Sequence, residues 1–242
     1  MSVSMGKDVI KRCLRAVNLF ADAAEADLEM IVSAARSVGF KKGARIFEEG
    51  STADCFYILT TGKARVVLAG NNGTEILLHI LMPPALFGEI ALLDRSTRSA
   101  SLVAADPCHL IRIPAVVLET LRREPAFEHR LVAGLVATLR RSDDRVRVIS
   151  SFPAVRRVAW CLGRIARDTG RREGTVLAFP KPPHSELAEM AGCTRETVSR
   201  VLGLLHRKKY ISWDQHSMRI EIDMMQRYLT TELSTKDVST DT

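Results

Sequence analysis

The sequence predicts an α+β protein in which a β-rich first domain is followed by one long helix and by a small, mostly helical second domain. Residues 40–115 contain short β-rich runs that are separated by turn signals. Residues 128–149 repeat apolar side chains at helical spacing, and the Phe-Pro pair at 152–153 ends that helix. The length of 242 residues suits two domains, at about 100–200 residues each.

The composition excludes several classes of protein. With 46% hydrophobic and 26% charged residues, the chain resembles an ordinary globular protein and is not disordered throughout. No apolar run approaches the about 20 residues that span a bilayer, and charged residues interrupt the start of the chain where a signal peptide has its apolar core. We therefore expect a cytoplasmic protein with no membrane partner. Five cysteines without a C-x-x-C pair argue against a disulfide framework, a zinc finger and a clustered iron–sulfur site.

The elements of the first domain follow from hydrophobic periodicity. Residues 8–35 alternate apolar and charged positions at helical spacing, which predicts one or two short helices. The Asn72-Gly73 pair predicts a hairpin, because both central residues of a type I′ turn need positive φ. Several short strands at this spacing are typical of a sandwich or barrel. The predicted strands cover residues 44–47, 55–59, 64–69, 75–81, 99–104 and 109–113.

The long helix carries a narrow stripe that is apolar except at one serine. Its members are spaced close to a 3.5-residue repeat, which fits a two-stranded coiled coil between identical chains. Packing against the core of its own domain would produce a similar pattern, so both interpretations stay open. The stripe consists of Leu131, Leu135, Leu139, Ser142, Val146 and Ile149.

The second domain is predicted to be helical with short strands. A helix with one apolar face follows Pro153 and stops at Gly170. The remaining predictions are a strand at 175–179, helices at 185–191 and 195–207, a hairpin at 210–222 and a disordered tail at 231–242.

The net charge of +7 is concentrated in this second domain. Residues 151–210 contain 12 basic and 5 acidic residues, whereas the rest of the chain has 23 of each. A basic surface of this kind is expected where a polyanion such as double-stranded DNA binds, although a solvated basic face has the same composition.

Residues 184–203 satisfy the steric demands of a helix-turn-helix. Leu187 and Ala191 face inward, Ala188 is small where the helices cross, and Gly192 permits the turn. Val198 and Val201 anchor the second helix. The residues left at its start are Thr194, which can cap it, and the outward-facing Arg195, Glu196, Ser199 and Arg200. Arginine suits the two acceptors of guanine and glutamate can accept from cytosine, so these side chains are candidates for reading DNA bases.

A second motif lies in the β-rich region, at residues 87–93 and 98–100. Gly88 lets the backbone approach an anion, Glu89 can accept hydrogen bonds from a ribose hydroxyl, and Arg98 with Ser99 supplies donors that match a phosphate. From the residues alone, a surface salt bridge between Glu89 and Arg98 explains the pattern equally well.

Together, the two motifs resemble those of the CRP/FNR family, over roughly residues 15–225. The resemblance implies a cyclic-nucleotide-binding β-barrel or jelly roll at 1–127, a dimerisation helix at 128–151, a winged helix-turn-helix at 152–230 and a tail at 231–242. It also implies a homodimeric transcription regulator that binds inverted-repeat DNA in response to cyclic AMP or cyclic GMP. RNA polymerase is an expected further partner. No enzymatic activity, metal or haem is expected.

The resemblance also assigns residues. Glu89 would hold the ribose hydroxyl, and Arg98 and Ser99 the cyclic phosphate, with the rest of the ligand-binding set made of Gly88, Ile90, Ala91, Ser142 and Asp143. The pair Ser142-Asp143 stands where the family has a Thr-Ser pair that contacts the base. A carboxylate only accepts hydrogen bonds, and guanine offers two adjacent donors, so Asp143 favours guanine. The bases of DNA would be read by Arg195, Glu196 and Arg200.

Some features depart from the family. Pro83-Pro84 replaces a glycine-containing turn, and the segment between Glu89 and Arg98 is one residue shorter than in the bacterial cyclic AMP receptor protein, as in eukaryotic cyclic-nucleotide domains. Two alternatives therefore stay open: a DNA-binding regulator that responds to cyclic di-GMP or to no small ligand, and a nucleotide-binding protein-interaction module that does not bind DNA.

Overall fold

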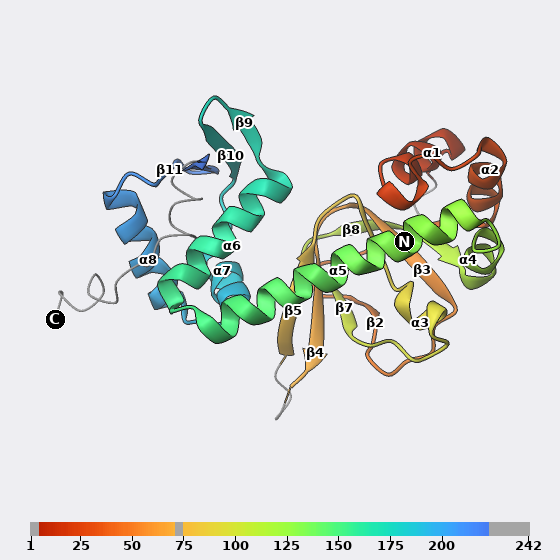
Figure 1. The fold of residues 1–242 in the computed structure, drawn as a ribbon, viewed down its shortest axis with the longest axis horizontal. Helices are drawn as coiled ribbons and strands as arrows, with labels where there is room; N and C mark the ends of the chain where they lie inside the picture. The colour runs from red at the N-terminus through yellow and green to blue at the C-terminus, as the bar shows by residue number, and fades with distance from the viewer. Residues whose placement is uncertain (1–4, 71–74, 223–242) are drawn as a thin grey trace. The chain divides into compact units, whose positions relative to one another are not determined.

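The computed structural model describes residues 5–70 and 75–222 of the chain (Figure 1). The chain divides into two compact units, Met1–Leu139 and Arg140–Thr242, and each is described by itself. The long helix α5 (Pro125–Ser151) contributes residues to both units. Among the described residues, no helix is both long enough and apolar enough to cross a membrane.

The N-terminal unit is built on two four-stranded antiparallel sheets, which confirms the predicted jelly roll. One sheet has the order β1-β8-β3-β6 and the other the order β2-β7-β4-β5. The strands are β1 (Arg36–Phe40), β2 (Arg45–Phe47), β3 (Cys55–Thr61), β4 (Ala64–Ala69), β5 (Glu75–Leu81), β6 (Ala85–Phe87), β7 (Ser101–Ala104) and β8 (Cys108–Pro114).

The central strand β3 is buried on both faces, because the sheet it belongs to separates two cores. Tyr57 and Leu59 face the core between the two sheets. Phe56 and Ile58 point to the opposite face and enter a second core made with helices. This alternation follows from the two-residue period of a strand.

Helices cover the outer face of the β1-β8-β3-β6 sheet. They are α1 (Lys7–Arg15), the short 3₁₀ helix η1 (Asn18–Phe20), α2 (Glu25–Ala34), α4 (Ala115–Leu121) and the first turns of α5. In Figure 1, α1, α2 and α4 gather at the same end of the unit. Phe20 lies at the centre of this core, with its ring 6.4 Å from that of Phe56 and 5.9 Å from that of Phe127, measured between centroids.

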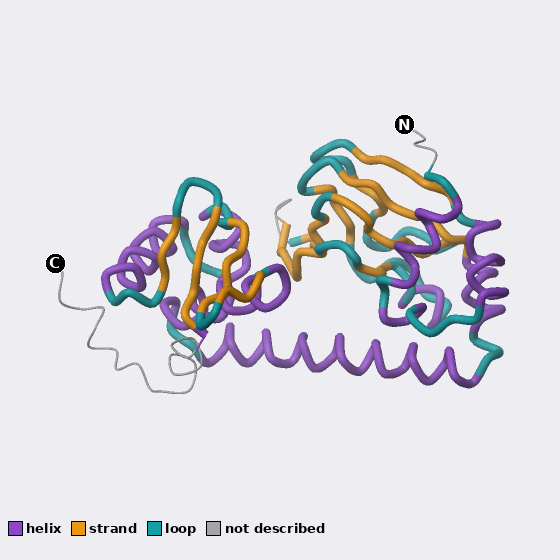
Figure 2. Tube along the Cα trace, turned by 90° about the horizontal axis from the view of Figure 1, so that it is seen from above, coloured by secondary structure: helices purple, strands orange, loops and turns teal. Residues whose placement is uncertain are grey.

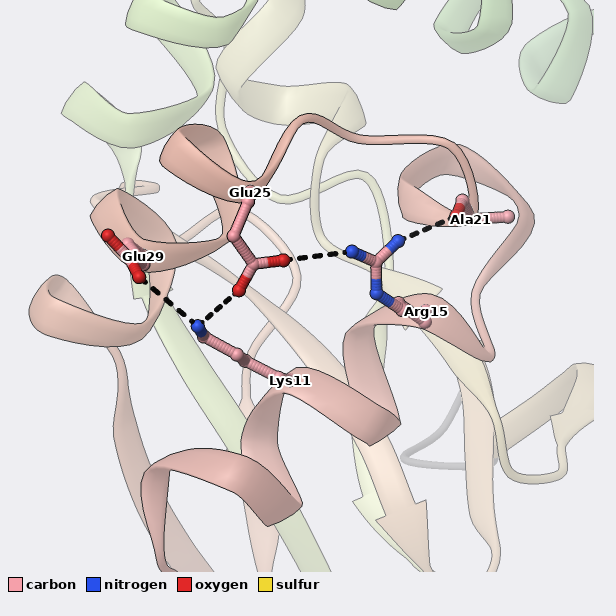
Figure 3. A network of polar contacts seen from close by, with 5 residues as sticks. All are labelled: Lys11, Arg15, Ala21, Glu25 and Glu29. Carbon is pink, nitrogen blue, oxygen red and sulfur yellow. Dashed lines mark hydrogen bonds and ion pairs between the residues drawn. The ribbon is translucent and has the colours of Figure 1, made fainter.

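Ion pairs join the first two helices at their surface (Figure 3). Lys11 on α1 pairs with both Glu25 and Glu29 on α2. Arg15 donates to Glu25 at 3.0 Å and to the carbonyl of Ala21 at 3.3 Å. The hydrogen bond from Lys11 lowers the pKa of the Glu25 carboxyl and raises that of Lys11. Three of these four charged side chains are exposed to solvent, so we expect the network to contribute little to the stability of the fold.

The structure corrects the predicted stripe on the long helix. Leu131 is buried and Leu135 is half-buried, and both pack against the core of their own unit. The exposed stripe is rotated around the helix and consists of Val132, Val136, Leu139, Val146 and Ile149. Neighbouring stripes of one helix have the same period, so spacing alone mixed members of two faces.

The C-terminal unit packs three helices on a four-stranded antiparallel sheet of order β11-β12-β10-β9 (Figure 2). Its elements are α6 (Ala154–Thr169), β9 (Arg171–Glu173), β10 (Val176–Pro180), α7 (His184–Ala191), α8 (Arg195–Arg207), β11 (Ile211–Trp213) and β12 (Ser217–Glu221). The three helices and β10 were predicted within two residues at each end, β11 and β12 lie within the predicted hairpin at 210–222, and β9 was not predicted.

Two predictions fall on residues outside the described part of the chain. The hairpin turn at Asn72-Gly73 is one, although its flanking strands do pair antiparallel, with Ala69 opposite Glu75. The tail at 231–242 is the other, together with the last residues of the predicted second domain.

Candidate functional site

The predicted phosphate motif lies between β6 and β7, in a loop interrupted by the four-residue helix α3 (Ile90–Leu93). Gly88 begins this loop with φ of +83°, a conformation that side chains rarely adopt. A Cβ atom at this position would lie 2.6 Å from Nη1 of Arg98, so any other residue here would displace the guanidinium from its present place. The backbone of Arg98 is fixed by two hydrogen bonds, from its N–H to the carbonyl of Ser51 and from the N–H of Gly50 to its carbonyl, both 2.8 Å.

Arg98 is a buried cation that donates to neutral groups. Only 3% of the residue is exposed. Nη1 donates to the carbonyl of Gly88 at 2.6 Å, and Nη2 donates to that of Cys55 at 2.7 Å. Its Nε is buried and has no hydrogen-bond partner among the described residues. A buried guanidinium is costly unless an anion pairs with it, so this site is suited to a phosphate.

The guanidinium of Arg98 packs against a cluster of aromatic rings. Arg98 lies 4.3 Å from the centroid of the Phe47 ring, a cation–π contact. The Phe47 ring in turn lies 6.1 Å from those of Tyr57 and Phe87, which stack on each other at 5.5 Å. Burial raises the pKa of Tyr57 to about 12, so this support stays neutral at physiological pH.

Glu89 presents a carboxyl oxygen that lacks a donor. Its Oε2 atom is buried, and no hydrogen-bond partner is found for it in the described structure. Burial raises the pKa of Glu89 to about 7, against the opposing effects of its own backbone N–H and of the charge on Arg98. The surface salt bridge that the sequence allowed does not form, since Arg98 donates to carbonyls instead. A ligand hydroxyl would satisfy the Glu89 oxygen.

The structure brings six of the eight predicted ligand residues together in this loop. Ala91 is buried, whereas Ile90 and Ser99 are exposed. The hydrogen bonds of α3 begin with the N–H groups of residues 92 and 93, which donate to the carbonyl of Glu89 at 3.0 and 3.1 Å. The N–H groups of Ile90 and Ala91 precede these bonds, at the N-terminal end of α3. Donors at that end of a helix have no acceptor within the helix.

Ser142 and Asp143 are on the part of α5 that belongs to the other unit, and both are exposed. Their approach to a bound base stays a prediction.

Sequence reasoning missed the residues that hold Arg98. Phe47, Ser51 and the carbonyl of Cys55 precede it by 43 to 51 positions and reach it only because β2 and β3 fold beside the loop. The sequence signal in this region is Gly50, a predicted turn residue with φ of +77°, whose N–H binds the carbonyl of Arg98.

The second motif forms the predicted helix-turn-helix. Gly192 adopts the left-handed conformation, with φ of +59°, and the N–H of Cys193 donates to the carbonyl of Ala188 at 3.0 Å. Thr194 caps α8, where its hydroxyl accepts from the N–H of Thr197 at 3.2 Å. The predicted inward residues are all buried, namely Leu187, Ala188, Ala191, Val198 and Val201.

The outward face of α8 is exposed at all five predicted residues: Thr194, Arg195, Glu196, Ser199 and Arg200. Besides Thr194, two of these side chains have hydrogen-bond partners on neighbouring side chains of α7 and α8. The Ser199 hydroxyl lies 2.9 Å from Nδ1 of His184 at the start of α7, and Arg200 donates to the Thr197 hydroxyl at 3.5 Å. The pKa of Glu196 is lowered by hydrogen bonds from its own backbone N–H and from Thr194.

Comparisons with known proteins agree with both motifs. Residues 37–124 match the family model described as a cyclic nucleotide-binding domain, and residues 156–227 match that of a Crp-like helix-turn-helix domain. The Cyclic AMP receptor protein of Thermus thermophilus is 35% identical over 188 residues, which are 77% of this chain and 84% of that protein. The chain belongs to the CRP/FNR family. It is a transcription regulator with a cyclic-nucleotide-binding domain and a DNA-binding helix-turn-helix.

Two further similar proteins agree with this family in sequence and in fold. The CRP-like cAMP-activated global transcriptional regulator of Mycobacterium tuberculosis is 27% identical over 185 residues, which cover 76% of this chain and 83% of that protein. The structure of FixK2 from Bradyrhizobium japonicum covers 82% of this chain and 99% of its own, with a TM-score of 0.71 at 19% identity, and this likeness concerns the fold.

The raised pKa of Glu89 predicts a pH-dependent stability. Its value of about 7, against an ordinary 4.5, means that the folded protein holds a proton that the unfolded chain releases in this range. The free energy of unfolding should therefore fall as the pH rises from 4.5 to 7, by up to about 1.4 kcal/mol per pH unit. Urea unfolding at several pH values measures this slope.

Glu89→Gln should reduce the slope, because glutamine does not titrate. Exposed Glu119→Gln serves as the control and should leave it unchanged. An identical slope in wild type and Glu89→Gln would contradict the assignment.

Proposed function

We propose that this CRP/FNR regulator acts as a cytoplasmic homodimer, without enzymatic activity, that binds a cyclic mononucleotide at Arg98 and inverted-repeat DNA through α8. The observation that carries the proposal is the pairing of two unsatisfied buried groups in one loop, the Nε of Arg98 and the Oε2 of Glu89. A cyclic nucleotide carries an anion and a ribose hydroxyl side by side and complements both. RNA polymerase is the expected protein partner of a regulator bound at a promoter.

Each residue of the loop has a role in this proposal. The guanidinium of Arg98 and the hydroxyl of Ser99 bind the cyclic phosphate, and Glu89 accepts from the ribose hydroxyl. Gly88 keeps room for Arg98, and the first N–H groups of α3, at Ile90 and Ala91, face the bound anion. A bound phosphate gives the buried guanidinium an anionic partner, and hydrogen bonds to an ionised acceptor are stronger than those to neutral carbonyls.

The exposed stripe on α5 supports the homodimer, with a second copy as the occupant. Its members Val132, Val136, Leu139, Val146 and Ile149 follow one another at intervals of 4, 3, 7 and 3 residues, close to the 3.5-residue repeat of a coiled coil. The gap of seven residues between Leu139 and Val146 has room for one further member, at Ser142 or Asp143. In a parallel pair of helices, the same position of each chain lies at the seam, so we expect this pair of residues to lie near the partner copy.

The family models favour this proposal over the alternatives. A cyclic nucleotide-binding domain speaks against a regulator without small ligand, and a Crp-like helix-turn-helix domain speaks against a module that only binds proteins. Cyclic di-GMP is included in the ligand panel below as a competing outcome.

Replacing Arg98 by Ala should remove most of the affinity for the ligand. Truncating one partner of a buried charge pair costs about 2–5 kcal/mol, which is at least about a 30-fold loss in affinity. Titration calorimetry of the full chain with cyclic AMP, cyclic GMP and cyclic di-GMP measures this loss. Arg95→Ala, in an exposed position of the same loop, is the matched control and should keep wild-type affinity. Equal binding by a folded Arg98→Ala variant would rule out the site.

Asp143 is proposed to favour cyclic GMP over cyclic AMP, because its acceptors match the two adjacent donors on guanine. Asp143→Ser should shift the preference toward cyclic AMP in the same calorimetric titrations. Asp144→Ser removes a neighbouring exposed carboxylate, leaves Asp143 in place and should keep the wild-type order. A clear preference of the wild type for cyclic AMP would count against this role of Asp143.

Arg195 should specify DNA sequence, whereas Lys208 should contribute affinity alone. A bidentate arginine–guanine pair discriminates against other bases by about 1–3 kcal/mol, and a lysine beyond the end of α8 can reach only phosphate. Selection of bound sequences from a random pool should therefore show relaxed preference at one position of each half-site in Arg195→Ala. Lys208→Ala should bind all sequences more weakly, with a shallower dependence on salt. Failure of the wild type to enrich an inverted repeat would refute the dimeric recognition proposed here.

A further inference from the structure

The junction between α5 and α6 is short, and backbone hydrogen bonds connect both of its residues to the adjoining helices. Only Phe152 and Pro153 separate the two helices. The N–H of Phe152 donates to the carbonyl of Val148 and completes α5, while the N–H of Arg157 donates to the carbonyl of Pro153 and begins α6, both at 3.1 Å. A change in the direction of the end of α5 therefore acts directly on the first turn of α6.

The side chain of Arg157 connects this junction to the helix-turn-helix. Its Nη1 donates to the carbonyl of Phe152 at 3.1 Å. Its Nε donates to the carbonyl of Ala191 at 2.7 Å, and its Nη2 donates to that of Gly192 at 3.0 Å. One guanidinium thus binds three carbonyls from two segments that lie about 40 positions apart in the chain.

The three acceptors are well matched to a cation. Phe152, Ala191 and Gly192 lie at or just beyond the C-terminal ends of α5 and α7. Carbonyls at these ends have no partner within the helix, and the helix dipole places partial negative charge there. The half-buried position of Arg157 limits competition from water.

The position of Gly192 determines where the DNA-reading helix begins. Gly192 is the left-handed turn residue, and Arg195, the first residue of α8, follows three positions later. Between them stand Cys193, whose N–H is bonded back to α7, and the capping residue Thr194. A displacement of the Gly192 carbonyl would therefore move the start of α8 as well.

We propose that Arg157 is a positioning residue that transmits a change at the end of α5 to the start of α8. This inference rests on the proposed function, because it concerns how ligand binding changes DNA affinity. The planar guanidinium is essential to it, since its separate N–H groups hold three carbonyls in fixed directions. A lysine keeps the charge, but its single ammonium cannot hold the three carbonyls in these fixed directions.

The adjacent Arg156 provides a matched control. Its guanidinium lies 4.2 Å from the centroid of the Phe152 ring, so it also contacts the junction, through the ring and not the carbonyl. Arg156→Lys and Arg157→Lys both retain the net charge and alter neighbouring positions of α6.

The first measurement is the affinity of the full chain for its selected DNA site, with and without cyclic AMP or cyclic GMP. We expect Arg157→Lys to reduce the ratio of the two affinities at least about five-fold, the size of a typical coupling between sites. Non-specific DNA binding should stay within about two-fold of wild type, since the charge is retained. Arg156→Lys should keep the wild-type ratio. A wild-type ratio in Arg157→Lys would overturn the proposal.

The second measurement needs no ligand. Amide hydrogen exchange reports local opening. Arg157→Lys should speed exchange together at Phe152 and at Cys193, whereas Arg156→Lys should leave the Cys193 amide unchanged. Faster exchange at only one of these two amides, or at neither, would overturn the proposal. If wild-type DNA binding responds to neither nucleotide, the proposed ligand response fails, and hydrogen exchange still decides whether Arg157 links the two segments.

Discussion

The candidate site in the N-terminal unit depends on one buried charge, the guanidinium of Arg98, which groups from several strands must surround. In its buried position it donates to the carbonyls of Gly88 and Cys55, lies against the Phe47 ring and occupies the space that a Cβ at residue 88 would enter. These groups come from different strands, so the sheets must pair in register before Arg98 can be satisfied. A binding site that draws on several strands is pre-organised by the fold itself.

The sequence predicted the elements whose local pattern is strong. The two helices of the helix-turn-helix, with their glycine turn and threonine cap, follow from side-chain size and periodicity within 20 residues. Strands β1, β6 and β9 escaped prediction because they are only three to five residues long and half-buried or exposed, so they show little alternation. The stripe on α5 was misplaced because two faces of one helix share the same period.

In the candidate site, too, residues close together in the sequence were predictable and residues far apart were not. Six of the predicted ligand residues lie together in the structure because they occupy one continuous loop, which begins at Gly88 and ends at Ser99. Phe47 and Ser51 were not predictable, because only sheet formation brings them to Arg98, and no spacing rule spans the 47 to 51 positions between them. The hydrogen bonds of Arg157 to three carbonyls could not be predicted from the sequence either, because every residue has a backbone carbonyl.

The two faces of α5 have a thermodynamic consequence. Leu131 and Leu135 close the core of the sensor on one face, and the adjacent face carries the exposed stripe from Val132 to Ile149. When a second copy covers that stripe, it binds only chains in which α5 is already folded against its core. By mass action, the melting temperature of the sensor then rises with protein concentration, so the number of molecules in the cell becomes one of the variables that set its stability.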